Sequence, residues 1–200
     1  MAIGGVGMQN YVITIARGYG SGGKTIGQML SKELGIEYYD KDLIKIASDE
    51  SGINESLFGS KDEKVTKSII KKNSRISQDK LFEFQSEAIR KLASQESCII
   101  IGRCADNILK DYKNVVRIFI YADFESCVQT VMDRFGYTAK ESEKKILSID
   151  KERSEYYIYH TGNDWRNATN YDLCINSGEI GFDKVIKMVK EYIKIRFDQC

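Results

Sequence analysis

Five short stretches of the chain are mostly apolar, and longer stretches with apolar residues at helical spacing lie between most of them. The short stretches cover residues 11–16, 36–39, 97–102, 115–121 and 171–176. Because they largely lack the polar alternation of a half-exposed strand, they predict parallel strands buried on both faces. The longer stretches predict helices over residues 26–34, 42–47, 79–95, 123–135 and 181–197, and a charged stretch at 62–72 and a polar one at 140–159 are also expected to be helical.

Strands that alternate with helices predict an α/β fold, here a three-layer αβα sandwich around a five-stranded parallel sheet. Two hundred residues suit one domain. We expect residues 11–200 to form it, after a disordered N-terminal stretch at 1–10. Open parallel sheets bind ligands beyond the carboxyl ends of their strands. The residues directly after each strand are therefore the candidates for a functional site.

The first predicted strand leads into a glycine-rich segment that a predicted helix follows, Gly18-Tyr19-Gly20-Ser21-Gly22-Gly23-Lys24-Thr25. This segment meets the pattern G-x-x-x-x-G-K-[ST] of a phosphate-binding loop, in the strand-to-helix setting that the pattern requires. The expected nucleotide-binding residues are Gly18, Gly20, Ser21, Gly22, Gly23, Lys24 and Thr25.

The residue types of this loop suit phosphate chemistry. Glycines let several backbone N–H groups approach phosphate oxygens without Cβ atoms in the way, and the helix N-terminus adds its own donors. Lys24 supplies a mobile positive charge for the β- and γ-phosphates, and the Thr25 hydroxyl is a ligand for Mg²⁺. ATP and Mg²⁺ are therefore the expected cofactors. The alternative is a glycine-rich turn that binds no ligand.

Charged residues also follow the second and third predicted strands. Asp40 and Asp42 follow the second, and Arg103 and Asp106 follow the third. Arg103 is placed to hold a second phosphate through parallel N–H donors, or it forms an ion pair with Asp106 or Asp40. Asp40 and Asp42 are typical of the start of a helix, and they are also candidates for a position near the metal or an acceptor hydroxyl; the two interpretations do not exclude each other.

The segment 137–162 is rich in charge and tyrosine, and we expect it to form a lid. Asp150 and Arg153 are three residues apart and share one face of a helix. A basic lid would exclude water and neutralise charge during phosphoryl transfer, whereas the alternative is an ordinary solvated helix. His160 is the only histidine and is expected to be a surface or packing residue rather than a base.

Composition excludes several classes of protein. The chain has 30 basic and 29 acidic residues, which argues against extensive contact with nucleic acid or a membrane. Five scattered cysteines without a C-x-x-C pair argue against a zinc site and a disulfide framework. Cys98, Cys127 and Cys174 lie in apolar stretches and are expected to be buried. Neither a membrane span nor a signal peptide is recognisable, so a cytoplasmic location is expected.

Five segments together resemble the bacterial cytidylate kinase-like family, in the nucleoside monophosphate kinase branch of P-loop proteins. They are residues 13–23, 38–44, 101–106, 150–153 and 170–177. The resemblance covers nearly the whole chain after Asn10. It implies the strand order 2-3-1-4-5, an acceptor-binding segment at about 43–95, and MgATP-dependent phosphoryl transfer to CMP or dCMP.

The resemblance also implies roles for individual residues. Arg103 would hold the acceptor phosphate, Asp150 the sugar and Arg153 the phosphates, while Cys104 stands where cytidylate kinases have a nucleoside-contacting Asp. The expected catalytic residues are Lys24, Arg103 and Arg153, and the expected metal ligand is Thr25. The expected substrate-binding residues are Asp40, Asp42, Arg103, Asp106, Asp150 and Arg153.

Two other functions stay open at this point. Asp40-x-Asp42 resembles the Asp-x-Asp of shikimate and related P-loop kinases, whose acceptor is a non-nucleotide hydroxyl compound. Gly102 stands where a Walker-B-type Asp would end the third strand, which leaves room for a regulatory nucleotide-binding module without transfer activity. The expected partners are small-molecule nucleotides, and the chain is expected to be a monomer or a homodimer.

Overall fold

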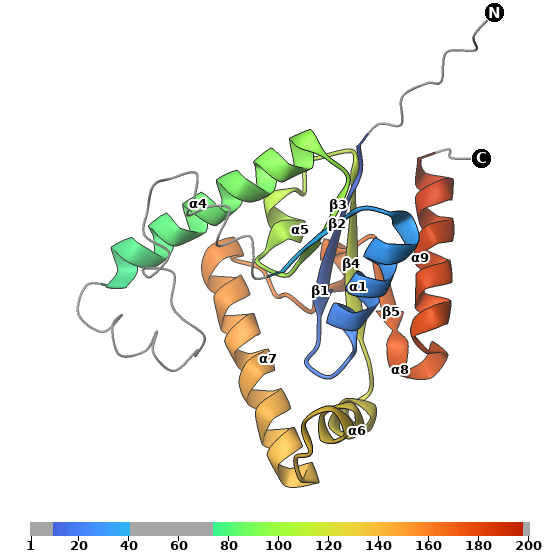
Figure 1. Cartoon of the computed structure of the whole chain (residues 1–200). Helices are drawn as coiled ribbons and strands as arrows, with labels where there is room; N and C mark the ends of the chain where they lie inside the picture. The colour runs from blue at the N-terminus through green and yellow to red at the C-terminus, as the bar shows by residue number, and fades with distance from the viewer. Residues whose placement is uncertain (1–9, 41–73, 198–200) are drawn as a thin grey trace, which may run out of the picture.

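The computed structural model describes residues 10–40 and 74–197, with the backbone alone at 74–78, and is built around one parallel sheet (Figure 1). The strand order is β2-β3-β1-β4-β5. This order and the α/β class confirm the predicted fold. The strands are β1 (Val12–Arg17), β2 (Glu37–Tyr39), β3 (Cys98–Ile101), β4 (Val115–Tyr121) and β5 (Leu173–Asn176).

Strand β1 lies at the centre of the sheet and pairs with β3 on one side and β4 on the other. In this register Ile15 is the partner of both Ile101 and Ile118. All three side chains are almost completely buried, as a central parallel strand requires. The carboxyl ends of β1 and β3 therefore lie side by side, and the loops that follow them meet.

Helices cover both faces of the sheet (Figure 1). Helices α1 and α9 lie on one face, and α4, α5 and α7 lie on the other, with α6 beyond the carboxyl edge. Isoleucine, leucine and valine side chains fill both interfaces. The helices are α1 (Gly23–Leu34), α4 (Ser74–Gln95), α5 (Ala105–Ile108), α6 (Phe124–Phe135), α7 (Ala139–Thr161), α8 (Ser177–Ile180) and α9 (Phe182–Arg196), with a 3₁₀ turn at Ala168–Asn170.

Local capping explains where α6 and α7 begin and end. Asp123 accepts a hydrogen bond from the Ser126 N–H at the start of α6. Thr138 and Glu141 form a reciprocal capping box at the start of α7. Gly136 and Gly162 end the two helices in left-handed conformations. The turn between α6 and α7 is thus specified by local sequence.

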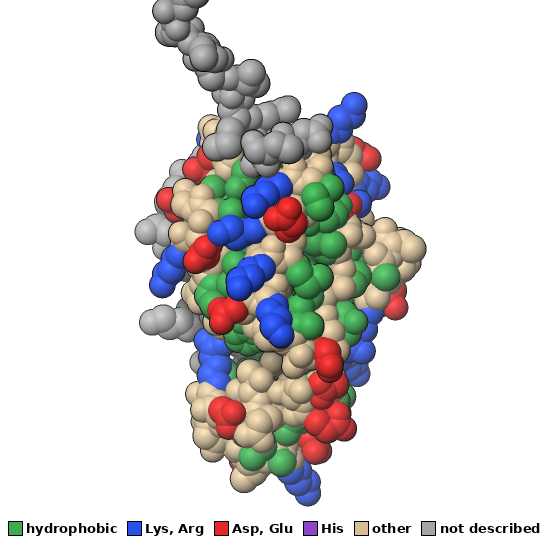
Figure 2. Space-filling view, turned by 90° about the vertical axis from the view of Figure 1, so that its right-hand side faces the viewer, with side chains coloured by type: hydrophobic (Ala, Val, Ile, Leu, Met, Phe, Trp, Pro, Cys, Tyr) green, Lys and Arg blue, Asp and Glu red, His purple; other side chains and the backbone are tan. Residues whose placement is uncertain are grey.

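The outer face of α9 mixes lysine and arginine side chains with apolar ones (Figure 2). Met188 and Ile195 are exposed there. In the described ranges, no helix combines the length and the apolar character needed to cross a bilayer.

Several sequence predictions differ from the structure or fall outside it. The strands and long helices agree within a few residues, but the short helices α5 and α8 were not predicted. The helices expected at 42–47 and 62–72, and the N-terminal stretch at 1–9, lie outside the described residues. The prediction that Cys174 is buried is wrong, because it lies on the edge strand β5 and is exposed, whereas Cys98 and Cys127 are buried.

Candidate functional site

The glycine-rich loop connects β1 to α1, where a phosphate-binding loop is expected. Gly22 precedes the first turn of α1 with a φ of 77°. A Cβ atom at this position would overlap the ring of Phe182, so only glycine fits both the backbone angle and the space. Gly22, Gly23, Lys24 and Thr25 line a cavity at this end of α1, where the unpaired N–H groups of a helix N-terminus favour an anion.

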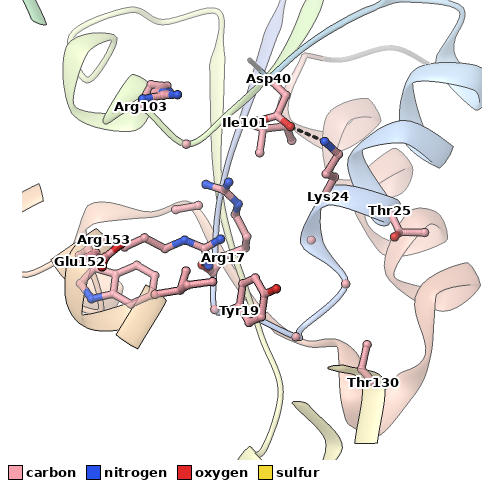
Figure 3. Close-up of a pocket in the computed structure, with 18 of the residues that line it drawn as sticks. Arg17, Tyr19, Lys24, Thr25, Asp40, Ile101, Arg103, Thr130, Glu152 and Arg153 are labelled. Carbon is pink, nitrogen blue, oxygen red and sulfur yellow. Dashed lines mark hydrogen bonds and ion pairs between the residues drawn. The ribbon is translucent and has the colours of Figure 1, made fainter. Parts of the chain in front are cut away.

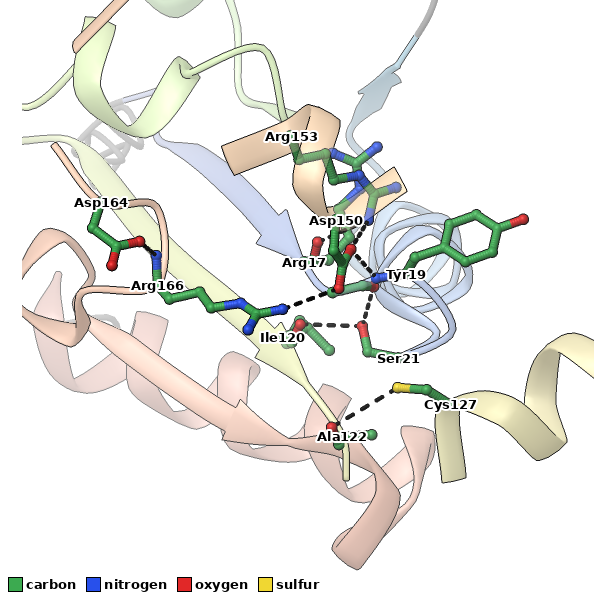
Figure 4. Close-up of polar contacts among 11 residues, drawn as sticks. Arg17, Tyr19, Ser21, Ile120, Ala122, Cys127, Asp150, Arg153, Asp164 and Arg166 are labelled. Carbon is green, nitrogen blue, oxygen red and sulfur yellow. Dashed lines mark hydrogen bonds and ion pairs between the residues drawn. The ribbon is translucent and has the colours of Figure 1, made fainter. Parts of the chain in front are cut away.

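Hydrogen bonds hold the loop against the end of β4. The Gly18 N–H donates to the Ile120 carbonyl at 3.0 Å. The Ser21 hydroxyl lies 2.9 Å from the Gly18 carbonyl and 3.1 Å from the Ile120 carbonyl (Figure 4). Ser177, after β5, donates to the Ser21 carbonyl at 2.6 Å. The Ser21 side chain therefore braces the loop and does not line the cavity.

Lys24 in the first turn of α1 forms an ion pair with Asp40 at the end of β2. The distance from Lys24 Nζ to Asp40 Oδ2 is 2.6 Å. The Lys24 side chain is 41% exposed and that of Asp40 is 14% exposed, so the lysine can reach a ligand while the carboxylate stays fixed. Asp42, the other predicted carboxylate, lies outside the described residues.

Three arginine side chains come from three different elements to one side of the cavity (Figure 3). They are Arg17 from β1, Arg103 from the turn after β3, and Arg153 from α7. Arg153 Nη1 donates to the Arg17 carbonyl at 3.0 Å, and its guanidinium lies over the Tyr19 ring at 5.5 Å. Burial and the charges of Arg153 and Arg103 lower the pKa of Arg17 to about 10, although Asp40 opposes this shift.

The turn after β3 has an uncommon backbone. Gly102, Arg103 and Cys104 are consecutive residues in the left-handed region, with φ of 67°, 60° and 56°. A non-glycine residue held there costs about 1–3 kcal/mol, and such residues concentrate at functional sites. Arg103 lies beside the Tyr156 phenol. In the part of the chain that the structure describes, neither Asp40 nor Asp106 forms an ion pair with Arg103.

Asp150 on α7 contacts the phosphate-binding loop directly (Figure 4). Its Oδ1 accepts the Tyr19 N–H at 2.8 Å and lies 3.3 Å from Arg153 Nη1. Its Oδ2 lies 3.3 Å from Arg166 Nη2. Burial raises the pKa of the Asp150 carboxyl, and the Tyr19 N–H and both arginines oppose that rise. Both oxygens are engaged by the protein itself, so this carboxylate anchors the loop to α7.

Asp106 in α5 is buried and lines the same cavity as the three arginines. Its Oδ2 accepts the Tyr157 hydroxyl at 2.5 Å. Burial raises the pKa of the Asp106 carboxyl, which the hydrogen bond from Tyr157 partly offsets. This contact joins α5 to α7 in the wall of the cavity, which both residues line.

The cavity itself has a volume of about 800 Å³ and brings most of the predicted site residues together. Among the predicted residues, those that line it are Gly18, Gly20, Gly22, Gly23, Lys24, Thr25, Asp40, Arg103, Asp106 and Arg153. Ser21 and Asp150 do not line the cavity, and their hydrogen bonds hold the loop in place. Arg17, Tyr156 and Phe182 also line the cavity and were missed. Arg17 ends a buried strand at the ligand-binding edge, and that position could have identified it.

Comparisons with known proteins agree with this architecture. A sequence model of the cytidylate kinase-like family matches residues 12–179. A cytidylate kinase from Sulfurisphaera tokodaii is 23% identical over 186 residues, which cover 91% of this chain and 94% of that protein.

Solved structures with the same arrangement include an uncharacterized protein from Eubacterium ventriosum. It has a TM-score of 0.75 at 29% identity, and the match covers 92% of this chain and 99% of that one. A shikimate kinase from Bacteroides thetaiotaomicron has a TM-score of 0.55 at 12% identity, with 92% and 98% of the two chains covered. At 12% identity, the similarity to the shikimate kinase shows a shared fold and nothing more.

Proposed function

The chain belongs to the cytidylate kinase-like family, and from this premise we propose that it transfers the γ-phosphoryl group of ATP to the phosphate of a nucleoside monophosphate, CMP or dCMP in particular. The observation that carries the proposal is the cavity in which the phosphate-binding loop and Lys24 face Arg17, Arg103 and Arg153. A donor phosphate chain and an acceptor phosphate would bring together several negative charges, and this set of cations matches them.

The residues present fit a magnesium ion bound through the donor. Thr25 lines the cavity at the start of α1, and Asp40 lines it beside Lys24. Among residues 10–40 and 79–197, no group of three or more His, Cys, Asp or Glu side chains is arranged to hold a metal ion by itself. Mg²⁺ commonly takes one or two protein oxygens and completes its shell with phosphate oxygens and water. When bound, it would neutralise charge on the donor phosphates.

In the proposed reaction an oxygen of the acceptor phosphate attacks the γ-phosphorus, and the bond from that phosphorus to the bridging oxygen of ADP breaks. The backbone N–H groups of the loop and Lys24 would hold the donor, while Arg103 and Arg153 would hold the acceptor and the group in transfer. A phosphate acceptor is already anionic near neutral pH, so this step requires no general base.

A hydroxyl acceptor is the second candidate, and Asp40 is the observation that favours it. An alcohol must lose a proton during transfer, and Asp40 is a carboxylate that lines the cavity beside Lys24. In this alternative Asp40 would accept the proton. Binding of a nucleotide without transfer is the third candidate.

One assay separates these functions. Release of ADP is measured with MgATP and each of CMP, dCMP, UMP, AMP, GMP and shikimate, for the wild type and for Lys24→Ala. We expect turnover with CMP or dCMP and a loss of about 100-fold or more in Lys24→Ala, since removal of one electrostatic contact to the transferring group has this effect. Lys194→Ala, which removes an exposed lysine on α9, is the matched control and should keep full activity.

The other outcomes point elsewhere. Turnover with shikimate alone would favour the hydroxyl acceptor. ATP binding without turnover on any of these acceptors would favour the regulatory module and contradict the proposed kinase.

A further inference from the structure

Arg17 is the last residue of β1, and its side chain extends from the phosphate-binding loop toward the turn after β3 (Figure 3). Its stem packs against Gly23, where an added Cβ would lie 2.6 Å from the Arg17 Cβ. Its guanidinium lies against Gly102, where an added Cβ would overlap Nη1. The charged group thus lies between the donor-binding loop and the turn that carries Arg103.

The guanidinium has no hydrogen-bond or ion-pair partner among the residues that the structure describes. The nearby carboxylates already have partners: Asp40 pairs with Lys24, Asp106 accepts from Tyr157, and Asp150 accepts from Tyr19 and faces Arg153 and Arg166. A guanidinium has five N–H donors, and a partly buried one without an acceptor is costly. Within residues 10–40 and 79–197, the fold therefore maintains a positive group without an acceptor.

Two neighbouring arginines increase the free-energy cost of this unpaired charge instead of reducing it. Arg103 and Arg153 carry the same charge, and their repulsion contributes to the lowered pKa of Arg17. Even so, the group is still cationic at neutral pH. Three arginines that share one partly enclosed cavity are stable together when an anion lies between them.

We propose that Arg17 binds the phosphate of the acceptor, by parallel N–H donors from the cavity floor between the phosphate-binding loop and Arg103. This assignment rests on the proposed function, because it takes the acceptor to be a monophosphate. In this proposal the loop N–H groups and Lys24 bind the donor phosphates. The Arg17 guanidinium is turned away from the loop and lies against Gly102. Arg17 accordingly belongs to the acceptor side of the cavity.

The test compares anion binding by Arg17→Met and Arg17→Lys with that of the wild type. Binding of CMP, inorganic phosphate and MgADP is measured separately by isothermal titration calorimetry. We expect Arg17→Met to bind CMP and inorganic phosphate about 10- to 100-fold more weakly, as the loss of a charge-assisted bidentate contact predicts, and to bind MgADP within about twofold of the wild type. Arg17→Lys should recover part of the lost affinity, because lysine keeps the positive charge but cannot donate two parallel N–H bonds.

Arg196→Met is the matched control, since Arg196 ends α9 and pairs with Asp172 away from the cavity. Circular dichroism and thermal unfolding establish that each variant is folded. Equal phosphate affinity in the wild type and Arg17→Met would overturn the assignment, as would absence of phosphate and CMP binding in the wild type. If phosphate binding depends on Arg17 but no monophosphate is turned over, the anion site stands and the proposed function fails.

Discussion

At the scale of single residues, the contact between Arg17 and Gly102 connects backbone conformation with the proposed binding of the acceptor phosphate. Gly102 has a φ of 67° and no Cβ, and the Arg17 guanidinium occupies the space that a Cβ would take. The two residues are far apart in sequence and become neighbours because β1 pairs with β3. The proposed acceptor site therefore depends on a glycine that binds nothing itself.

Gly102→Ala is expected to displace the Arg17 guanidinium without unfolding the protein, because the end of a long side chain can move. Affinity for CMP should fall about 10-fold, the equivalent of about 1.4 kcal/mol. Gly35→Ala is a matched control, since Gly35 also has a positive φ of 64° but nothing lies within 4 Å of an added Cβ. Both variants should lose about 1 kcal/mol of stability from backbone strain. Equal CMP affinity in the two variants, measured by titration calorimetry, would contradict the displacement.

At the scale of elements, α7 joins the phosphate-binding loop to the rest of the site. Asp150 contacts the loop at the Tyr19 N–H, Arg153 contacts the Arg17 carbonyl, and Tyr157 donates to Asp106 of α5. These residues recur at intervals of three and four, so one face of the helix carries them all. The segment predicted as a lid is, at residues 139–161, a helix that contacts the glycine-rich loop and the end of β1.

Asp150→Ala would leave the Tyr19 N–H without its acceptor. We expect a loss of about 1–3 kcal/mol in the free energy of unfolding, measured by urea titration, together with weaker MgADP binding. Arg166→Gln removes only one ion-pair partner of Asp150. Because the Arg166 side chain is 61% exposed, this change should lower the free energy of unfolding by less than about 1 kcal/mol. Similar losses in the two variants would argue against a role of Asp150 in holding the loop.

The contact between α4 and α7 predicts a dependence of stability on pH. His160 stacks on Phe82 with ring centroids 4.0 Å apart. Burial lowers the pKa of His160, although Asp79 opposes this shift. The folded state therefore binds a proton less readily than the unfolded state, whose histidine titrates near 6.5. Stability should be complete above about pH 6.5 and should decrease as the pH falls below that value.

The variant His160→Phe keeps an aromatic ring and removes the titration. Between pH 7.5 and pH 5.5 the wild type should lose more unfolding free energy in urea than this variant does. The difference should stay at or below about 1.4 kcal/mol, the equivalent of one pKa unit. An equal pH dependence of both proteins would show that His160 does not titrate differently on folding.

At the scale of the whole molecule, binding energy at the cavity should stabilise the entire fold. The residues that line the cavity come from β1, β3, α1, α5, α6, α7 and α9 and from the loops between them. A ligand that binds only the folded chain stabilises all of these elements together.

MgADP at 100 times its dissociation constant should add about 2.7 kcal/mol to the free energy of unfolding. For a chain of this size that corresponds to a rise of about 5–10 °C in Tm. Differential scanning calorimetry measures this shift, and Lys24→Ala at the same MgADP concentration should show a smaller one. A Tm independent of MgADP in the wild type would contradict nucleotide binding at the loop.

Sequence by itself determined the α/β class, the five strands, the phosphate-binding loop and the helix limits set by Thr138, Glu141 and Gly162. These features rest on local properties: apolar runs, glycine spacing and capping groups, which act between residues close in the chain. The burial of Cys174 was predicted wrongly because an apolar run does not tell a central strand from an edge strand.

Tertiary structure decided which charged side chains meet. It paired Lys24 with Asp40, engaged Asp150 with the loop and Asp106 with Tyr157, and left Arg17 facing the cavity. Each of these outcomes depends on distances between segments separated by 16 to 131 residues. The strand order β2-β3-β1-β4-β5 sets these distances. Composition and spacing can name the charged residues, but the free energy of a charge depends on its neighbours and its burial, which exist only in the folded chain.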